Sequence, residues 1–467
     1  MNILPLKFSE LNEEDFIFCD DSGAYFVSTE AFLKRYAEGF LQESDQQFLL
    51  DGGHAFQQEG DYRYLGYAAR WARRQFKPGA MDYVIMVPTL RCNLACHYCQ
   101  VSRANENARG VDWDDETLAA TLTFLDTLVS PKIKIEFQGG EPLLRLDILN
   151  KVRSFCRDRF QEAQFIVCTN LQDVSEEAWD FLNAPDTLVS TSFDGDFSKH
   201  KQQRTFTDSA TLTFQENLVH ALETLGPAKV SVLPTIDPAS PPSPRALISN
   251  FAALGIRSIY LRPVNHHGFA RKRFKNNSYG WEKYYDDFIE ELIVHNFNTE
   301  EILEEFYLTH CLRRVLQAGH HGHVDLRNPN FFGKDYVVVD YDGTFYPTDE
   351  ARMLRRIGHI DLSIGSVREG LDKQKIASMN ANSLNNFNED CIHCAFQPFC
   401  GTDIVDEISR YNRIDLPRHE TYFCQRHMFI FKKIFSLIYR DDLATRRSLA
   451  AWLDVPNFDP SLAVRHT

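Results

Sequence analysis

The chain has 467 residues, of which 43% are hydrophobic and 25% are charged, as in a soluble globular protein. This length exceeds that of one ordinary core, so we expect two or three domains. The net charge of −15 argues against a nucleic-acid partner, and no apolar run reaches the roughly 20 residues that a membrane-spanning helix needs. The N-terminal stretch turns acidic where a signal peptide has its apolar segment, so we expect a cytoplasmic protein without membrane contact.

Residues 1–80 are expected to form a small N-terminal α+β module. The apolar segments 16–19 and 24–27 flank the turn Asp20-Asp-Ser-Gly23, which is the pattern of a β-hairpin. Ser28-Thr-Glu precedes the segment 31–36, which indicates a capped helix.

From residue 81 the sequence alternates between strand and helix patterns. Strands are expected at 83–87, 133–137, 165–168, 187–192, 229–233 and 258–261. Helices are expected at 115–129, 146–160, 176–183, 214–224 and 245–254. Six βα units imply a parallel sheet with right-handed crossovers. Because a full barrel needs eight units, we predict an open, partial (β/α)6 TIM-like barrel over residues 81–275, with its chemistry at the carboxyl ends of the strands.

Residues 276–467 form a third region that is mostly helical. Helices are expected at 279–297, 299–317 and 427–439, with a hairpin of strands 336–340 and 344–346 between them. A cysteine-rich stretch precedes the last helix.

Cysteine is the most informative residue type in this chain. Eleven cysteines are present, and a cytosolic chain keeps them reduced, so a disulfide framework is not expected. Seven of the eleven fall into two closely spaced groups, which points to metal or iron–sulfur ligation.

The first group is Cys92-Asn-Leu-Ala-Cys96-His-Tyr-Cys99, directly after the first strand of the barrel. Three thiolates ligate three irons of a [4Fe–4S] cubane, and the fourth iron stays open to another ligand. Three buried structural thiols are the alternative, but the tight spacing favours the cluster.

This loop resembles that of the radical S-adenosylmethionine (SAM) superfamily, and the resemblance covers residues 81–265. It implies that the open iron binds the amino and carboxylate groups of SAM. One electron from the cluster then yields methionine and a 5′-deoxyadenosyl radical, which abstracts a hydrogen atom. The protein contributes position and water exclusion.

The turn Gly139-Gly140-Glu141-Pro142 ends the second strand. Its glycines would let the backbone approach a ligand closely. In the family this turn binds the SAM amino group, and Glu141 is a candidate acceptor for that ammonium. Such a turn alone is weak evidence, and its position at a strand end strengthens it.

Further segments resemble the SAM side of the family. Thr169-Asn170 ends the third strand, and Ser192-Phe-Asp194-Gly195 ends the fourth. The resemblance assigns Ser192 to the ribose and Arg204 to the SAM carboxylate, with a surface salt bridge as the alternative for Arg204. Tyr98 resembles the aromatic residue near the adenine.

The second group is Cys391-Ile-His-Cys394-Ala-Phe-Gln-Pro-Phe-Cys400, followed by Cys424. Four thiolates also suit zinc, which is the alternative. The spacing resembles the SPASM extension of radical SAM peptide-modifying enzymes. Two ligands of the full pattern are replaced, by Thr348 and Ile404. Because both serve the auxiliary cluster nearer the active site, we expect one complete auxiliary [4Fe–4S] cluster and no other.

Asp349 matches the position of an acid/base aspartate in sulfatase-maturating relatives, and a helix N-cap or hairpin-end role is the alternative. Cys311 is a candidate orphan of the missing cluster. The remaining cysteines are expected to be core thiols: Cys19, Cys156 and Cys168.

Longer phrases narrow the resemblance to the maturases of His-Xaa-Ser peptide systems. They are Thr89-Leu-Arg-Cys92, the segment 134–144, Arg327-Asn-Pro-Asn-Phe-Phe332 and the segment 340–350. The resemblance implies an enzyme that modifies a ribosomally made precursor peptide. Several relatives abstract a side-chain β-hydrogen and join that carbon to an aromatic ring, which gives a cyclophane. The auxiliary cluster could accept the electron that is lost when the ring regains aromaticity.

The expected partners are a precursor peptide with leader and core segments and an electron donor such as a flavodoxin or ferredoxin. The N-terminal module resembles one that holds a leader by adding a strand to a sheet edge, and a plain structural cap is the alternative. Two other functions stay open: a radical SAM peptide dehydrogenase or epimerase, and a non-catalytic iron–sulfur electron-transfer scaffold. The SAM-side segments argue against the scaffold, because an electron carrier needs no SAM pocket.

Overall fold

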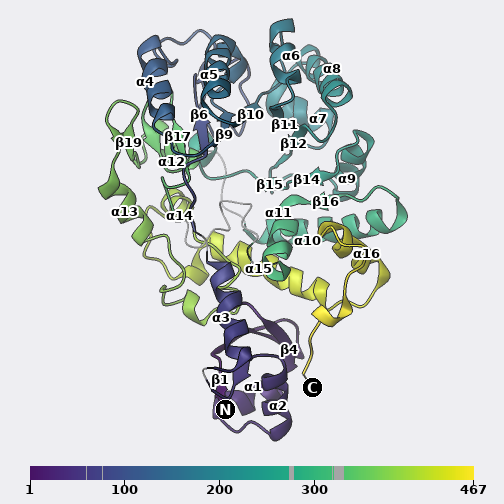
Figure 1. The fold of residues 1–467 in the computed structure, drawn as a ribbon. Helices are drawn as coiled ribbons and strands as arrows, with labels where there is room; N and C mark the ends of the chain where they lie inside the picture. Colours follow the sequence, from purple (N-terminus) through teal and green to yellow (C-terminus); the bar gives the residue numbers. More distant parts are fainter. Residues whose placement is uncertain (59, 76, 273–277, 318, 320–330, 467) are drawn as a thin grey trace.

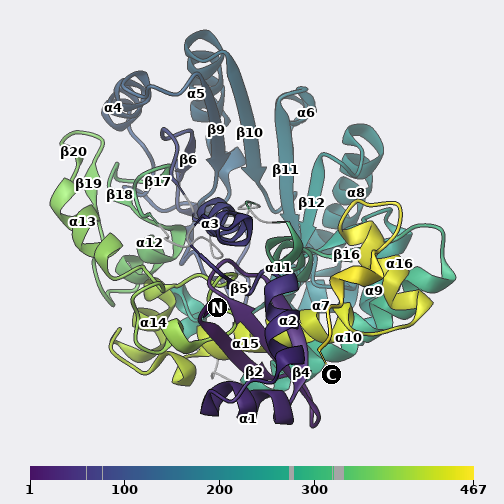
Figure 2. The same ribbon diagram turned by 60° about the horizontal axis from the view of Figure 1, so that its bottom comes forward.

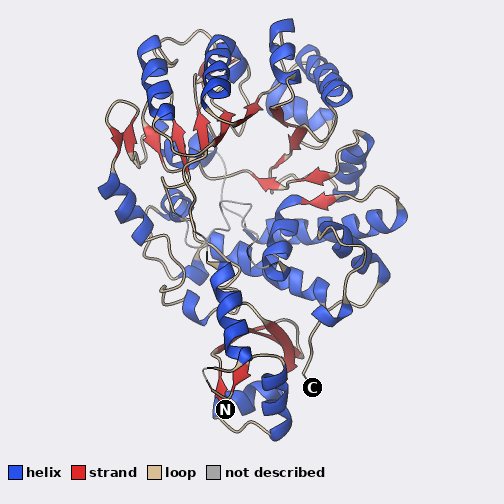
Figure 3. Cartoon of the chain, in the orientation of Figure 1, coloured by secondary structure: helices blue, strands red, loops and turns tan. Residues whose placement is uncertain are grey.

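The computed structural model describes residues 1–466 apart from 59, 76, 273–277, 318 and 320–330. An arc of strands carries helices on its outer side, and a small N-terminal module lies at one end of the molecule (Figures 1 and 3). Within these described residues, no helix combines the length and the apolar character needed to cross a membrane.

The N-terminal module contains the expected hairpin and helix. Its elements are β1 (Asn2–Ile3), β2 (Leu6–Glu10), β3 (Asp15–Asp20), β4 (Tyr25–Thr29), α1 (Glu30–Glu38), α2 (Glu43–Asp51), β5 (Ala55–Phe56) and α3 (Tyr62–Arg74). Strands β2, β3 and β4 form an antiparallel sheet in that order, and β1 pairs with β5. Thr29 precedes α1 as expected, but its side chain makes no capping hydrogen bond.

The two faces of the module's sheet belong to two different cores. Phe18, Phe26 and Phe32 pack together in a core of the module itself, and the rings of Phe18 and Phe26 stack at 5.1 Å. Ile17 and Val27 point to the other face and join the large core of the molecule. Successive strand residues face opposite sides, so a strand of alternating large apolar residues can serve both cores. The module is therefore fixed to the body through one face.

The main sheet begins with five parallel strands at the expected positions: β6 (Tyr83–Met86), β9 (Lys132–Phe137), β10 (Glu162–Cys168), β11 (Thr187–Ser192) and β12 (Val230–Leu233). The helices between them are α4 (Asp115–Asp126), α5 (Leu146–Arg159), α6 (Glu176–Asn183), α8 (Asp208–Leu225) and α9 (Pro244–Ala253). Inward and outward residues alternate along each strand, so every second side chain faces the inside of the arc.

The sixth strand of the expected barrel is not part of this sheet. β14 (Ser258–Ile259) pairs instead with β16 (Glu304–Glu305). Beyond the end of β12, β13 (Thr235–Ile236) pairs in parallel with β15 (Arg262–Pro263). β12 ends directly before Pro234, which has no amide hydrogen to continue a ladder.

The other edge of the sheet is extended by the C-terminal region. β17 (Tyr336–Val339) lies parallel to β6, and β18 (Phe345–Tyr346) follows as the other arm of the expected hairpin. The sheet therefore has seven strands in the order β12-β11-β10-β9-β6-β17-β18. The boundary expected at residue 275 lies outside the described residues.

The C-terminal region is helical, as expected, with shifted boundaries. Its elements are α10 (Ser278–Asn298), α11 (Phe306–Leu316), α12 (Asp349–Arg356), β19 (Gly365–Ser366), β20 (Gly370–Leu371), α13 (Lys373–Ala381), α14 (Ile404–Tyr411), α15 (Tyr422–Ile438) and α16 (Leu443–Trp452). The helix expected at 299–317 begins only at Phe306, because β16 occupies the preceding residues. After α16 the chain returns to the N-terminal module, where its end lies beside β4 (Figures 1 and 2).

The double role of β3 can be tested by truncating a side chain on its body-facing side. Ile17→Ala removes methylenes from a fully buried site, so it should lower the free energy of unfolding by about 2–5 kcal/mol. Phe8→Ala on β2, where the ring is 46% exposed, is the control and should change it by less than about 1 kcal/mol. Urea unfolding followed by circular dichroism measures both, and equal losses would contradict this packing.

Candidate functional site

A cavity of about 440 Å³ lies at the carboxyl ends of the main strands. Most of the expected site residues line it: Cys92, Cys96, Tyr98, Cys99, Gly139, Gly140, Thr169, Asn170, Ser192, Arg204 and Asp349. Two expected residues, Glu141 and Asp194, are buried behind this lining. The cavity therefore gathers residues from four strand ends, from the cysteine loop and from α12.

The cysteine loop is held at its start by a short pair of strands. β7 (Arg91–Cys92) runs parallel to β8 (Ala104–Asn105). The Arg91 guanidinium donates to Asp112 at 2.9 Å. This pairing leaves the three cysteines on a turn that faces the cavity.

The three thiols of this loop form no disulfide, and two of them, Cys92 and Cys96, have raised pKa values. Burial raises the pKa of Cys92 to about 12 and that of Cys96 to about 11. Both thiols are therefore protonated at neutral pH when nothing is bound to them. Binding of iron must displace these protons, so assembly of a cluster here depends on pH.

The glycines of the Gly139-Gly140 turn are required by the protein's own backbone. A Cβ on Gly139 would lie 2.2 Å from the Thr89 carbonyl oxygen, and one on Gly140 would lie 2.0 Å from that of Arg91. Gly139 also has a φ of 129°, which favours glycine. Besides the expected approach to a ligand, these glycines therefore let the turn pack against the cysteine loop.

Glu141 joins two strand ends and does not face the cavity. Its carboxylate accepts from the amide of Asn170 at 2.8 Å and from that of Leu143 at 3.2 Å. Burial raises its pKa to about 7. The backbone of the Gly139-Gly140 turn, rather than the Glu141 side chain, is exposed to whatever occupies the cavity.

Asp194 is the centre of a buried hydrogen-bond network. It accepts from the Tyr98 hydroxyl at 2.5 Å, from the Arg204 guanidinium at 3.0 Å and from the Thr235 amide at 3.2 Å. Arg204 also lies over the Tyr98 ring, 4.9 Å from its centre. Its side chain is 12% exposed, so the surface salt bridge considered for Arg204 is wrong: the ion pair is a buried one at the cavity wall.

Arg204 reaches this position from a short π-helical turn, Lys201–Thr205, that follows α7 (Phe197–His200). The carbonyl of Gln203 in this turn accepts from the amide of His97 in the cysteine loop at 2.7 Å. Such single-turn π segments are frequent at functional sites. The turn therefore fixes Arg204 relative to the cysteines.

Asn170 and Ser192 complete the side of the cavity nearest the cysteines. The Asn170 amide donates to the Asn93 side chain at 2.7 Å and lies 3.7 Å from the Cys92 sulfur. Ser192 ends β11 with its side chain on the inner face of the strand. Both residues stand where the sequence predicts them.

A group of polar side chains around Glu136, not predicted from the sequence, lines the cavity. The Glu136 carboxylate accepts from the Tyr83 hydroxyl, from the Gln138 amide at 2.5 Å and from the Cys168 thiol at 3.3 Å. The expectation that Cys168 is a core thiol is wrong, because it lines the cavity. Glu136 lies inside a parallel strand, and such strands are usually apolar on both faces. This exception is the sequence signal that could have revealed the polar group.

Asp349 lines the cavity, but it is bound to a buried arginine. The Arg352 side chain is fully buried and donates to the Asp349 carboxylate at 2.6 Å and 2.8 Å. The helix cap considered for Asp349 is provided instead by Thr348, whose hydroxyl accepts from the Ala351 amide at 3.1 Å. Both contacts are to Oδ1, so Arg352 fixes the position of this carboxylate at the cavity wall.

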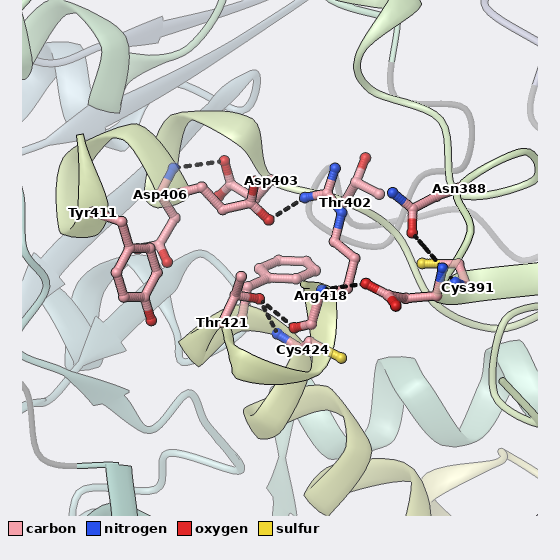
Figure 4. Close-up of polar contacts among 12 residues, drawn as sticks. Asn388, Cys391, Thr402, Asp403, Asp406, Tyr411, Arg418, Thr421 and Cys424 are labelled. Carbon is pink, nitrogen blue, oxygen red and sulfur yellow. Dashed lines mark hydrogen bonds and ion pairs between the residues drawn. The ribbon is translucent and has the colours of Figure 1, made fainter. Parts of the chain in front are cut away.

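The second cysteine group also comes together in space. Burial is the main cause that raises the pKa of Cys400, and the thiols of Cys391, Cys394 and Cys424 raise it further by their proximity. Figure 4 shows Cys391 beside Asn388, which accepts from its amide at 3.3 Å. It also shows Cys424 beside Thr421, which accepts from the Cys424 amide at 3.3 Å.

Arg418 is a cation close to two thiols of this second group. Its guanidinium is paired with Glu407 and lies near enough to oppose the rise in pKa of both Cys391 and Cys424. A positive charge at this place favours thiolates over thiols. In the described part of the chain, no set of three or more His, Cys, Asp or Glu side chains stands close enough to hold a single metal ion.

Thr348 and Ile404 stand at the two positions where the full SPASM pattern has further cysteines, and both contribute to the fold. Thr348 caps α12 and also lines the cavity. Ile404 begins α14 and is buried in a small apolar core with Val405 and Leu354. Asp403, directly before it, lines the cavity. The other cysteines of the chain, Cys19, Cys156 and Cys311, are buried in the main core.

Residues 86–219 match the model of the Radical SAM superfamily, so this part of the chain is a radical SAM domain. An uncharacterized protein of Methanocaldococcus jannaschii is 32% identical over 117 residues, which are 25% of this chain and 39% of that protein. The chain thus matches well under half the length of this curated relative.

Two solved structures share the fold. anSMEcpe with bound AdoMet has a TM-score of 0.59 and 18% identity, over 76% of this chain and 97% of that chain. Streptococcus suis SuiB bound to precursor peptide SuiA has a TM-score of 0.50 and 11% identity, over 88% of this chain and 97% of that chain. At these identities the likeness concerns the fold, and it confirms the α/β class with a parallel sheet.

The contact between the glycine turn and the cysteine loop predicts a specific defect. Gly140→Ala would place a methyl group against the Arg91 carbonyl, so it should displace the loop and prevent iron from binding to its three cysteines. Gly79→Ala is the matched control, since nothing lies within 4 Å of its added methyl group. Iron and sulfide analysis after anaerobic reconstitution should show the loss only in Gly140→Ala, and full iron content in that variant would contradict the packing.

Proposed function

We propose that this chain is a radical SAM maturase that modifies a ribosomally made precursor peptide by joining an aromatic ring carbon to a side-chain β-carbon. The observation that carries this proposal is one continuous cavity with two unlike walls. The cysteine loop and the SAM-side residues form one wall. The other is formed by Glu136 and by residues of the C-terminal region: Phe332, Tyr336, Thr348, Glu350 and Asp403. A substrate side chain can therefore enter beside the bound cofactor.

The residues of the first wall fit a [4Fe–4S] cluster with SAM on its open iron. Cys92, Cys96 and Cys99 would hold three irons, and the Gly139-Gly140 backbone would face the SAM amino group. Together, the cluster and SAM would supply a 5′-deoxyadenosyl radical for hydrogen abstraction. The protein's part is to hold this group against the substrate and to keep water out.

The SAM contacts that we propose follow from the buried network around Asp194. Ser192 would meet the ribose, and Thr169 with Asn170 would stand beside the ligand near Cys92. Arg204 keeps its place by pairing with Asp194, and its remaining N–H groups would meet the SAM carboxylate. Asp194 itself would act through Arg204 and Tyr98, because it is buried behind them.

We further propose one auxiliary [4Fe–4S] cluster on Cys391, Cys394, Cys400 and Cys424. A four-thiolate zinc site is the alternative. The spacing of these cysteines, which resembles that of the SPASM extension, supports the cubane. Thr348 and Ile404, in place of cysteines, support the absence of a second auxiliary cluster.

Ring closure releases a proton as well as an electron, and the cavity offers carboxylates to receive the proton. Glu136, Glu350 and Asp403 line it. Asp349 also lines the cavity, and it is the weaker candidate because its Oδ1 is already bound by Arg352. The electron would pass to the auxiliary cluster. A donor such as a flavodoxin or ferredoxin would supply the electron for SAM cleavage in the cytoplasm.

The peptide substrate is supported by the fold shared with SuiB bound to precursor peptide SuiA. The cyclophane product rests on the resemblance to His-Xaa-Ser maturases. Part of the segment 327–332 that contributes to this resemblance lies outside the described residues. The N-terminal module is the proposed place for the leader.

One observation favours a second function, that of a peptide epimerase. The Cys168 thiol faces the cavity and could return a hydrogen atom to a substrate carbon radical. This step forms a C–H bond and a sulfur radical, which one electron from an iron–sulfur donor and one proton would restore to the thiol.

The product distinguishes the two functions. Coexpression with a candidate precursor peptide, sought among short reading frames beside the gene, should give a product lighter by two hydrogens, whose fragmentation stops across a segment of three or four residues. Cys168→Ala should still form this product, because crosslinking needs no returned hydrogen. A product of unchanged mass that contains a D-residue, and is lost in Cys168→Ala, would contradict the crosslinking proposal in favour of epimerisation.

Iron content tests the cofactor count. The reconstituted chain should bind about eight irons, as two cubanes require. Replacing Cys92, Cys96 and Cys99 together by Ala should leave about four, and so should Cys391→Ser combined with Cys394→Ser. About twelve irons in the unaltered chain would contradict the single auxiliary cluster.

A further inference from the structure

The last residues of the chain lie along the open edge of the N-terminal sheet. The Val27 amide donates to the Val464 carbonyl at 2.9 Å, and the His466 amide donates to the Val27 carbonyl at 2.8 Å. The Ser28 hydroxyl donates to the His466 carbonyl at 2.9 Å. Val27 and Arg465 face each other in a parallel bridge, and Figure 2 shows the chain end beside β4. Residues 464–466, here called the tail, thus behave as an added strand.

The edge that the tail covers is one that a peptide can use. β4 ends the order β2-β3-β4, so one row of its N–H and C=O groups has no partner in the sheet. Strand addition to such an edge is a common mode of peptide recognition, in which the backbone gives affinity and side-chain pockets give specificity. The backbone bonds of the tail do not depend on its sequence.

The specificity element is a pocket that holds the His466 ring. This ring stacks on Phe48 at 4.3 Å with 17° between planes, and it meets the edge of Phe32 at 5.1 Å. Its Nε2 lies 2.7 Å from a carboxylate oxygen of Asp45. The histidine side chain is only 9% exposed. The pocket therefore has aromatic walls and an anionic end, which suits an imidazole.

The pocket does not depend on the tail for its shape. The Arg35 guanidinium donates to both oxygens of Asp45, at 2.7 Å and 2.8 Å, and lowers the pKa of that carboxyl far below its usual range. Asp45 also accepts from the Gln42 amide at the start of α2, at 2.9 Å. The carboxylate is thus built into the module and stays charged whether or not a histidine is present.

Outside this pocket the tail is held by its hydrogen bonds to Val27 and Ser28 and by contacts of Val464 and Arg465. Arg465 pairs with Asp15 at 3.0 Å, with its own side chain 48% exposed, and the Tyr439 hydroxyl donates to the Val464 carbonyl at 2.7 Å. An exposed ion pair contributes little. A short segment with one buried anchor can be exchanged for another segment with the same anchor.

We propose that the β4 edge and the Asp45 pocket form a binding site for an extended peptide with a histidine anchor, and that the chain's own tail fills this site until a peptide displaces it. The identification of that peptide with the precursor rests on the proposed function. The tail and the precursor then compete for one site, so the enzyme engages only peptides that supply both the strand and the imidazole.

Binding of the tail's own sequence tests this without iron, SAM or catalysis, so its outcome is independent of the proposed reaction. The probe is a labelled synthetic peptide with the sequence of residues 460–467, and anisotropy reports its binding. A chain that lacks residues 464–467 should bind the probe at least tenfold more tightly than the full chain, because a tethered competitor acts at a high effective concentration. The same probe with alanine in place of its histidine should bind at least tenfold more weakly.

Two full-length variants control for misfolding of the shortened chain. His466→Ala keeps the tail but removes its anchor, so it should also bind the probe more tightly than the unaltered chain. Ser461→Ala alters a residue before the tail and should bind the probe as weakly as the unaltered chain. Equal binding by the full chain, the shortened chain and His466→Ala would overturn the proposal, and so would equal binding of the two probes.

Discussion

The contact of two backbone segments, Gly139-Gly140 and residues 89–91, decides the geometry of this site. The amides of Gly140 and Glu141 donate to the carbonyls of Thr89 and Arg91 at 3.0 Å and 2.8 Å. No side chain fits between the segments, so the turn that ends β9 and the loop that carries the cysteines form one unit. The cavity exists because this unit closes one end of it.

Buried carboxylates keep the remaining parts of the site in register with this unit. Glu141 ties the end of β9 to the end of β10, and Asp194 ties the cysteine loop to Arg204 and to β13. Neither carboxylate faces the cavity, although the sequence suggests both as ligand contacts. A buried carboxyl group that is hydrogen-bonded fixes its neighbours more firmly than an exposed one would. Both groups therefore hold in place residues that line the cavity.

Local patterns predict the parts of the structure that depend on neighbouring residues, and they fail where distant segments meet. α6 and β11 begin and end where the sequence predicts them, because their caps and periodicity are local. The pairing of β17 with β6 joins segments about 250 residues apart, and no local pattern reports it. In the same way, the local spacing of Cys92, Cys96 and Cys99 predicts that these three residues belong to the site. It does not reveal that the Cys168 thiol contacts Glu136, because these residues lie on two strands, β10 and β9, that pair in the folded sheet.

The proposed function depends above all on a cluster, held by Cys92, Cys96 and Cys99, that cleaves SAM. The most direct test is the yield of 5′-deoxyadenosine after anaerobic reconstitution and reduction with dithionite in the presence of SAM, for the unaltered chain and for Cys96→Ala. We expect 5′-deoxyadenosine from the unaltered chain and none from the variant. Absence of 5′-deoxyadenosine from the fully reconstituted chain, or an equal yield from Cys96→Ala, would contradict the assignment of these cysteines.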